Sequence, residues 1–398
     1  MDKQIALATH NFSNEIRLML AILGGGGETS ALPDECLSGI DWAQFLRMVK
    51  HHRVYPLVYT NLKKSGAEAV PEFVMQSLYE DYCRNIFQMM RLTAEMERIY
   101  KTLQTNGIRT IVLKGPILAN ALYGNISMRT SKDLDMLIPA SDVERMEEIL
   151  REQGYDPTHD APQVLNTKKW KTHHLAYSHK ESGIQIEVHW RLNPNTVKEP
   201  TFDELWERSN TSTLVSTPLH YLGDADLFQY LISHGARHGW FRLRWLCDIQ
   251  SLLQREANWE LTARMFRQYD AAHLGGQAVI LANGLLGAPI PKGLRGLTTH
   301  PLALRLANDV LAFVRDIVNL SPKPETKEMA AKYRRYLFAM MSNRERGLYV
   351  MSQIYPSSWD AQALPLPKSL HFLYFPLRPF LWYWRKRKQQ AGGQTQTG

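Results

Sequence analysis

The chain has 398 residues, a formal net charge of +8 and 44% apolar residues. This length exceeds what one small core needs and the apolar content is that of a folded protein, so we expect two or three packed units and exclude a disordered chain. The basic charge favours an anionic partner such as a nucleotide, a nucleic acid or an anionic lipid surface.

The three cysteines, Cys36, Cys83 and Cys247, are far apart and show no CxxC spacing. This excludes a disulfide framework and a cysteine zinc site. The first twenty residues lack the sustained apolar core and the cleavage site of a signal peptide. We therefore expect a cytoplasmic protein.

Residues 1–105 are predicted to be helical. The stretches 41–64 and 82–104 place apolar residues at steps of three and four, for example Cys83, Ile86 and Met90. The run of four glycines within 22–35 lacks the Lys-Ser/Thr ending of a phosphate-binding loop, so this segment is interpreted as a linker.

A compact α/β pattern occupies residues 106–193. Strands are predicted at 107–115 and 133–138, a short helix opened by Pro116 lies between them, and a helix at 141–154 has Ser141 as its N-cap and Gly154 as its stop. The segments 172–179 and 183–190 form a predicted antiparallel hairpin. Helices are expected again over 194–360, followed by an aromatic and basic tail at 361–398. The fold class is α+β, with a small mixed-sheet core between helical regions.

Two aspartates in "DLDMLI" are the first chemical signal. Side chains alternate along a strand, so Asp133 and Asp135 share one face and project together while the apolar residues between them pack on the other. In "IQIEVHW" the same alternation puts Glu187 on the polar face of its strand. Paired carboxylates repel unless a cation joins them, so this pattern predicts Mg²⁺ (or Mn²⁺) held by Asp133, Asp135 and Glu187, as in two-metal phosphoryl or nucleotidyl transfer.

A phosphate-binding half accompanies the acids. Gly115 lets the backbone approach a phosphate, and the helix that begins at Pro116 offers its amides to the same anion. Lys114, Arg129 and Lys132 add positive charge, so an NTP is the expected substrate.

The segment 108–190, with "LKG", "YG", "DLDMLI" and "EVHW", resembles the catalytic core of the DNA polymerase β-type nucleotidyltransferase superfamily, and most of all its bacterial branch of proteins assigned to nucleotidyl transfer. The resemblance implies that Gly115 binds the triphosphate, that Asp133 and Asp135 bind the metals, and that Glu187 completes the site and activates an acceptor hydroxyl. It implies transfer of an NMP group, with ATP as the expected donor. Pro116 stands where the superfamily usually has serine, and Lys114 substitutes for that hydroxyl electrostatically.

Downstream polar residues have two readings. His234 and His238 are four apart on a predicted helix, a spacing that suits zinc, but no third ligand is evident. We assign them, with His189 and Arg242, to nucleotide or acceptor binding in a cleft between the sheet and the helices. His173, His174 and His179 are either exposed polar residues at a strand edge or substrate contacts.

The tail combines aromatic residues with the basic run 385–388. Pro376 and Pro379 interrupt its apolar stretch, which is therefore shorter than the continuous apolar segment that a bilayer span needs. Two interpretations of the tail are equally compatible with the sequence: it docks on the anionic inner face of a membrane, or it is an ordinary terminal helix that packs on the body. Nucleic acid is a secondary candidate partner because no recognised binding motif occurs. The acceptor, whether small molecule, sugar, peptide or protein, is left open, and the alternative function is a non-catalytic nucleotide-binding or membrane-associated partner protein.

Overall fold

A computed structural model describes residues 7–25, 37, 39–65, 70–158, 172–194, 196, 198–320 and 324–392. Four helices precede the sheet: α1 (Asn14–Gly24), α2 (Trp42–His51), α3 (Tyr55–Ser65) and α4 (Glu72–Thr105). Residues 22–24 of the predicted linker close α1, and residues 26–36 lie outside the described part. Cys36 lies in that segment.

Seven strands form one mixed sheet in the order β3-β4-β5-β2-β1-β7-β6. Their bounds are β1 (Ile111–Val112), β2 (Asp133–Leu137), β3 (Tyr155–Pro157), β4 (His174–His179), β5 (Gln185–His189), β6 (Asn210–Ser212) and β7 (Leu219–Tyr221). The predicted hairpin is confirmed, because β4 pairs antiparallel with β5. The centre of the sheet is a parallel pair, β2 with β5.

The structure differs from the sequence-based expectation in several places, and one of them is β3, a strand that was not predicted. The first strand is only two residues long, and β6 and β7 extend the sheet past residue 193, where only helices were expected. These strands are three residues each, and the polar sequence of β6 carries no strand signal. Ser141 does not cap the following helix, because a short 3-10 turn at Ala140–Asp142 precedes α6 (Val143–Glu152) and makes Asp142 the N-cap residue.

Both faces of the sheet are covered. Leu134, Met136 and Ile138 project from one face into a core that α4 and α6 complete. Leu137 projects from the other face into the larger core of the helical body. Between the strands lie α5 (Pro116–Tyr123), a 3-10 turn η2 (Ile126–Met128) and α8 (Phe202–Glu207).

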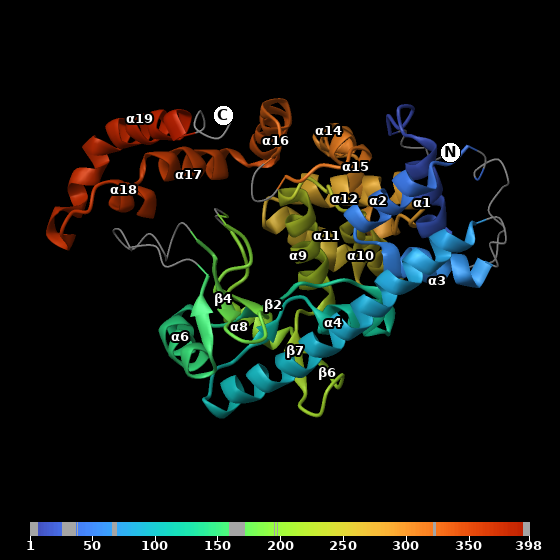
Figure 1. Cartoon of the computed structure of the whole chain (residues 1–398), viewed down its shortest axis with the longest axis horizontal. Coiled ribbons are helices and arrows are strands. Elements are labelled where there is room, and N and C mark those ends of the chain that lie inside the picture. Colours follow the sequence, from blue (N-terminus) through green and yellow to red (C-terminus); the bar gives the residue numbers. More distant parts are fainter. Residues whose placement is uncertain are drawn as a thin grey trace.

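The helices before and after the sheet share one core. α1, α2 and α3 pack with a bundle that follows β7 in the chain, and residues of both groups belong to the same buried cluster. The bundle consists of α9 (Asp224–Arg237), α10 (Leu243–Leu253), α11 (Trp259–Gln268), α12 (Ala272–Leu286), η4 (Lys292–Leu294), α13 (Arg295–Thr298), α14 (Ala303–Asp309) and α15 (Leu311–Arg315). Figure 1 shows this helical body above the sheet, with α4 crossing beneath it.

α16 (Lys327–Met340) packs against the body, with Tyr336 in its core. The helices that follow extend from there as an arm (Figure 1): α17 (Asn343–Ile354), α18 (Ser358–Ala363), η5 (Lys368–Leu373) and α19 (Tyr374–Gly392). Tyr374 and Leu381 belong to a small cluster of the arm's own. Among the described residues, no helix has the length and apolarity needed to cross a membrane.

Candidate active site

Strand register brings two acidic residues face to face. Asp135 of β2 is the direct partner of Glu187 of β5, while Asp133 lies opposite Gln185 and Leu137 opposite His189. Neighbouring strands are about 4.8 Å apart, so side chains at paired positions on the same face contact each other. The shared face that the alternation predicts for Asp133 and Asp135 therefore also holds Glu187 and His189.

That face is not open to solvent. Asp135 is 1% exposed, against the expectation that the carboxylates project outward, because the helical body covers this side of the sheet. A buried carboxylate needs cationic or hydrogen-bonding partners. Lys114 Nζ lies 2.9 Å from Asp135 Oδ1, and His189 Nε2 lies 3.2 Å from the same oxygen. His189 Nε2 is also 3.4 Å from Glu187 Oε2, so one imidazole lies between the two carboxylates.

The electrostatics of these groups follow from their mutual contacts. Burial alone would raise the pKa of Asp135, but Lys114 and His189 outweigh it and hold that pKa well below its usual range. Burial opposes the charge of Lys114 too, yet Asp135 keeps its pKa above the ordinary value. Burial likewise disfavours protonated His189, and hydrogen bonds to Asp135 and Glu187 raise its pKa. The cluster therefore carries ionised carboxylates held by a charged lysine.

The donor set fits a divalent cation. One ligand atom each from Asp135, Glu187 and His189 lies within 4.8 Å of the others. Asp135 Oδ2 is buried and has no hydrogen-bond partner among the described residues, so one oxygen of this carboxylate is unsatisfied. Carboxylate oxygens are the ligands that Mg²⁺ and Mn²⁺ prefer. Asp133 is not part of this close group, and burial together with the charge of Asp135 raises its pKa.

Gly115 begins α5 with a backbone conformation of φ +88° and ψ −146°. An L side chain rarely adopts this φ, and a Cβ here would also meet Leu134 and the carbonyl of Asp133. The first amides of α5 therefore follow a glycine turn directly beside β2.

Four cations gather near Asp133. Arg53, from the connection between α2 and α3, interacts electrostatically with Asp133, and Lys132, Arg242 and Arg244 interact with Arg53. Burial and repulsion by neighbouring arginines lower the pKa of Arg244 to about 9 and that of Arg242 to about 10. Among the described residues, Arg53 has no side-chain hydrogen bond or ion pair. Such a concentration of incompletely compensated positive charge suits an anionic ligand.

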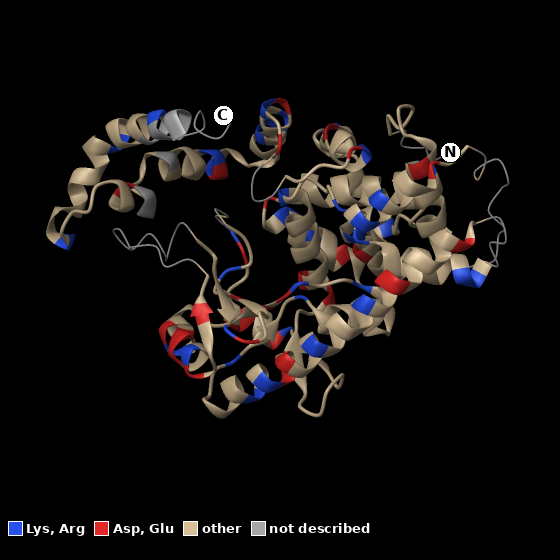
Figure 2. Cartoon of the chain, in the orientation of Figure 1, with Lys and Arg blue, Asp and Glu red and all other residues tan. Residues whose placement is uncertain are grey.

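We call these four residues the basic cluster. Lys132 and Arg242 are among the residues assigned from the sequence, but Arg53 is not, because it precedes the β2 acids by 80 positions in an unremarkable helical region. Figure 2 shows blue and red segments meeting where the helical body joins the sheet. Arg242 is also anchored, since it donates to the His51 carbonyl and, over 3.0 Å, to Asn319 Oδ1.

Arg129 has a different use from the one predicted. Its Nε lies 3.1 Å from both carboxylate oxygens of Asp248, and its Nη2 lies 3.0 Å from Oδ2. Both side chains are buried, and the Tyr123 hydroxyl donates to the same carboxylate over 3.0 Å. Arg129 is thereby committed to joining the sheet segment to α10, so its assignment to the nucleotide is corrected.

The histidines of α9 line the helical side of the site. His234 is buried, and the rings of His234 and His238 lie against Trp245 of α10, with the His238 ring stacked on it at 5.2 Å. Burial and the charge of nearby cations lower the pKa of His238 to about 3 and put that of His234 well below its usual range, so both rings are neutral. Among the described residues, neither belongs to a group that could hold a metal.

His173, directly before β4, is buried rather than an exposed edge residue. His173, His174 and His189 place one ring nitrogen each within 4.8 Å of the others. Burial and neighbouring positive charge lower the pKa of His174 to about 4, so its ring is neutral near pH 7. His174 Nε2 lies 3.8 Å from Glu187 Oε2, which puts this ring on the outer side of the same acid. His179 lies at the far end of the strand, with its ring beside Tyr155.

Comparison with known proteins adds one finding. A family described as uncharacterised nucleotidyltransferase matches residues 38–287, from just before α2 to the end of α12. This range contains both acidic strands, the glycine turn and the basic cluster. No curated protein matches the chain.

Proposed function

The chain belongs to the family of uncharacterised nucleotidyltransferases, and from that membership we propose that it transfers an NMP group from an NTP, ATP in the first place, to a hydroxyl or phosphate of an acceptor. The observation that carries the proposal is the pairing of Asp135 with Glu187 across parallel strands, together with the buried and unpartnered Oδ2 of Asp135. Carboxylates in this arrangement require a cation, and phosphate transfer uses one.

Asp135 and Glu187 would hold Mg²⁺ or Mn²⁺, with Asp133 contributing from the start of β2. When bound, the ion neutralises charge on the phosphates and polarises them toward attack. His189 orients the two carboxylates through its Nε2. Lys114 supplies a fixed positive charge at the same place, since its pKa is raised by Asp135 despite burial.

The triphosphate would bind between the glycine turn and the basic cluster. Backbone amides at the start of α5 follow Gly115, whose positive φ turns the chain into that helix beside β2. Arg53, Arg244 and Lys132 lie on the Asp133 side of the site and supply the charge that a polyphosphate needs.

Glu187 is suited to receive the acceptor's proton. It is 28% exposed at its side chain, compared with 1% for Asp135, so an acceptor can reach it. Burial alone would raise its pKa, but hydrogen bonding to His189 and nearby positive charge lower it, and the carboxylate is ionised near pH 7. Positioning and charge neutralisation then provide most of the rate.

The test is turnover of α-labelled NTPs with Mg²⁺ by the wild type, Asp135→Asn and Glu187→Gln. Asp156→Asn, which affects only an exposed pair with Lys180, is the matched control. We expect label transfer or pyrophosphate release by the wild type and the control, with a loss of at least 100-fold in both site variants. Mg²⁺-dependent nucleotide binding without any turnover would favour the alternative of a non-catalytic nucleotide-binding protein.

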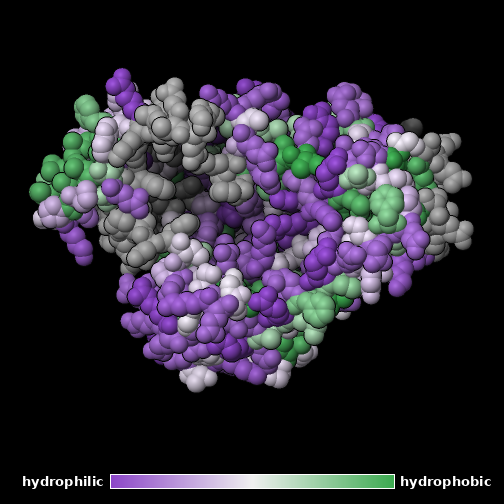
Figure 3. Space-filling model, in the orientation of Figure 1, coloured by the Kyte–Doolittle hydropathy of each residue, from purple (hydrophilic) through white to green (hydrophobic). Residues whose placement is uncertain are grey.

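A second proposal concerns the arm. Phe380, Trp382, Tyr383 and Trp384 of α19 are each at least half exposed, and the helix continues into the basic run 385–388. Figure 3 shows one of the hydrophobic patches of this face at the end of the molecule formed by the arm. Exposed aromatic rings beside clustered basic residues suit an anionic membrane surface, which we propose as the docking partner at the cytoplasmic face.

Flotation with vesicles of mixed phosphatidylglycerol and phosphatidylcholine tests this second proposal. The full chain should float, and Phe380→Ser/Trp384→Ser should float at least fivefold less. Equal flotation of the two proteins, or equal binding to pure phosphatidylcholine, would exclude docking by this surface.

A further inference from the structure

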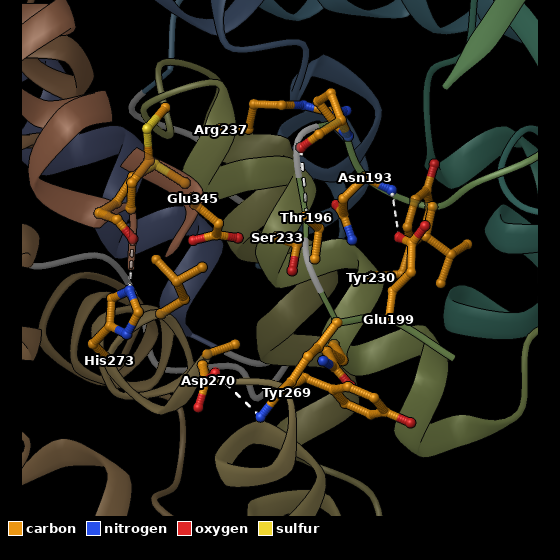
Figure 4. Close-up of a pocket in the computed structure, with 18 of the residues that line it drawn as sticks. Asn193, Thr196, Glu199, Tyr230, Ser233, Arg237, Tyr269, Asp270, His273 and Glu345 are labelled. Carbon is orange, nitrogen blue, oxygen red and sulfur yellow. Dashed lines mark hydrogen bonds and ion pairs between the residues drawn. The ribbon is translucent and has the colours of Figure 1, made fainter. Parts of the chain in front are cut away.

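A cavity of about 250 Å³ lies beside the candidate active site. Its walls come from the segment that follows β5, from α9, from the start of α12 and from α16 and α17. Figure 4 shows Ser233, Tyr230 and Arg237 along α9 with Glu345 on the opposite wall and Asn193, Thr196 and Glu199 on the segment after β5. Its volume suits a small molecule, not a protein segment or a nucleic-acid duplex.

Two residues belong both to the cavity and to the active site. The ring of Tyr230 lies 6.0 Å from Lys114 Nζ, which is paired with Asp135. Arg237 Nη1 lies 3.3 Å from His173 Nε2, and the His173 ring lies 5.5 Å from that of His189. The cavity is therefore separated from Asp135 and Glu187 by a single layer of side chains.

Polar atoms along the wall have no partners. The hydroxyl of Tyr230 is buried and has no hydrogen bond among the described residues, and Tyr230 as a whole is 1% exposed. The neighbouring Gln229 also lines the cavity and has an unpartnered buried Oε1. Buried polar atoms without partners are unfavourable, and a ligand that brings its own donors and acceptors to this wall would satisfy them.

Among the described residues, the charged side chains on the cavity wall have close compensating partners, with one exception. Glu199, Asp226 and Asp270 are paired with Arg191, Arg208 and Lys198, at 2.8, 2.9 and 3.4 Å. The fourth carboxylate, Glu345, accepts from the Ser342 amide at the start of α17, where the helix amides favour a negative charge.

Arg237 is the exception. Among the described residues no carboxylate lies within ion-pair distance of it, and its Nη atoms meet His173 Nε2 and His234 Nδ1, each at 3.3 Å. Burial and surrounding positive charge lower the pKa of both histidines, so both are neutral, and the guanidinium interacts with the carboxylates of Glu187 and Asp135 only beyond ion-pair distance. A partly buried guanidinium of this kind is a site for a carboxylate or phosphate group.

We propose that this cavity binds the acceptor, and that the acceptor is a small hydroxylated molecule whose anionic group, phosphate or carboxylate, pairs with Arg237 while a hydroxyl bonds to Tyr230. This proposal rests on the proposed nucleotidyl transfer, because it takes Glu187 as the group that the reacting hydroxyl reaches. It places the donor's triphosphate on the Asp133 side of the site and the acceptor on the Glu187 side. It also favours a small molecule over a peptide or protein acceptor.

Direct binding tests the proposal without requiring turnover. The probes are glycerol 3-phosphate, glycerate and glycerol, which share a small hydroxylated skeleton and differ in charge. Titration calorimetry is performed on the full chain and on Arg237→Gln, Arg237→Lys, Tyr230→Phe, Arg53→Gln and Arg109→Gln. Arg53→Gln tests the competing possibility that the anion binds at the basic cluster, and Arg109→Gln, which removes a charge from an exposed ion pair with Asp203, is the matched control.

We expect at least one anion to bind the wild type and Arg109→Gln with similar affinity, and glycerol not to bind. Arg237→Gln should weaken that binding at least tenfold, Arg237→Lys less, and the anion that binds more tightly identifies the source as phosphate or carboxylate. The proposal is overturned if neither anion binds the wild type, if glycerol binds equally well, or if Arg53→Gln and not Arg237→Gln removes binding. Should Arg237→Gln not fold, unchanged anion affinity in both Arg237→Lys and Tyr230→Phe overturns it.

Binding of a Mg²⁺-nucleotide analogue to the same proteins separates the two proposals. Its absence in the wild type would contradict nucleotidyl transfer whatever the anions do. Retained nucleotide binding in Arg237→Gln, together with lost anion binding, would assign Arg237 to the acceptor alone.

Discussion

The ammonium of Lys114 lies 2.9 Å from Asp135 Oδ1, and both side chains are largely buried. The lysine stands immediately before the glycine turn, and the aspartate lies in the middle of β2. A positive side chain thus balances the acid that we propose as a metal ligand. In the protein without metal, this ion pair is what makes a buried Asp135 tolerable.

Lys114→Met should therefore destabilise the metal-free protein by roughly 3–5 kcal/mol, because it leaves a buried carboxylate without its main partner. Added Mg²⁺ should restore more stability to the variant than to the wild type, since the ion takes over the compensation of Asp135. Urea unfolding with and without Mg²⁺ measures both effects. Lys180→Met, in an exposed ion pair with Asp156, should cost less than about 1 kcal/mol. An equal loss with and without Mg²⁺ would argue against a metal at Asp135.

The pH dependence of metal binding should follow His189. Its folded pKa is raised above 6.5, so its contribution to stability is full below pH 6.5 and is lost as the pH rises through the higher folded value. Over that same range above pH 6.5 the imidazolium loses its charge, and the carboxylates become freer to bind a cation. The stabilisation by Mn²⁺, measured as a shift in melting temperature, should increase from pH 6.5 upward in the wild type. In His189→Gln the shift in melting temperature should vary much less with pH. A pH profile identical to that of the wild type would contradict this explanation.

Asp248→Asn tests the structural use of Arg129. The change leaves a buried guanidinium without its carboxylate and should lower the free energy of unfolding by roughly 3–5 kcal/mol. Asp203→Asn is the control, because Asp203 forms an exposed pair with Arg109. Chemical denaturation gives both values. A loss for Asp248→Asn no larger than that of the control would show that Arg129 is not held by this pair.

Arg53→Gln should weaken NTP binding. Loss of one charge-assisted hydrogen bond to phosphate costs roughly 1.5–3 kcal/mol, which corresponds to a roughly 10- to 100-fold higher Kd. The difference should shrink for the monophosphate, because that ligand lacks the phosphates that the basic cluster would bind. Fluorescence titration of ATP and AMP analogues measures this contrast. An equal effect on both nucleotides would place Arg53 outside the triphosphate site.

The sequence predicted the acidic face correctly because strand alternation is a local property. Asp133, Asp135 and Glu187 needed only the period of two within two short strands, and the parallel pairing of β2 with β5 then put Asp135 opposite Glu187. The positive φ of Gly115 is likewise a local property, because glycine adopts this backbone conformation without the steric cost that other residues meet.

Burial and long-range pairing could not be predicted in this way. The cover over Asp135 comes from helices that follow about a hundred residues later, so a single strand pattern cannot distinguish an open acidic face from a closed one. Arg129 looked like a phosphate ligand because its partner Asp248 is 119 positions away. Arg53 gave no signal, because its relation to Asp133 arises only when α2 and α3 pack against the body.

The measurement that tests the central claim most directly is binding of a non-hydrolysable ATP analogue with and without Mg²⁺ by the wild type and Asp135→Asn. It needs no knowledge of the acceptor. The account predicts binding to the wild type that Mg²⁺ strengthens at least tenfold, and no Mg²⁺ effect in Asp135→Asn. Nucleotide binding that is independent of Mg²⁺ in the wild type, or equal in the two proteins, would contradict a metal-nucleotide site at Asp135 and Glu187.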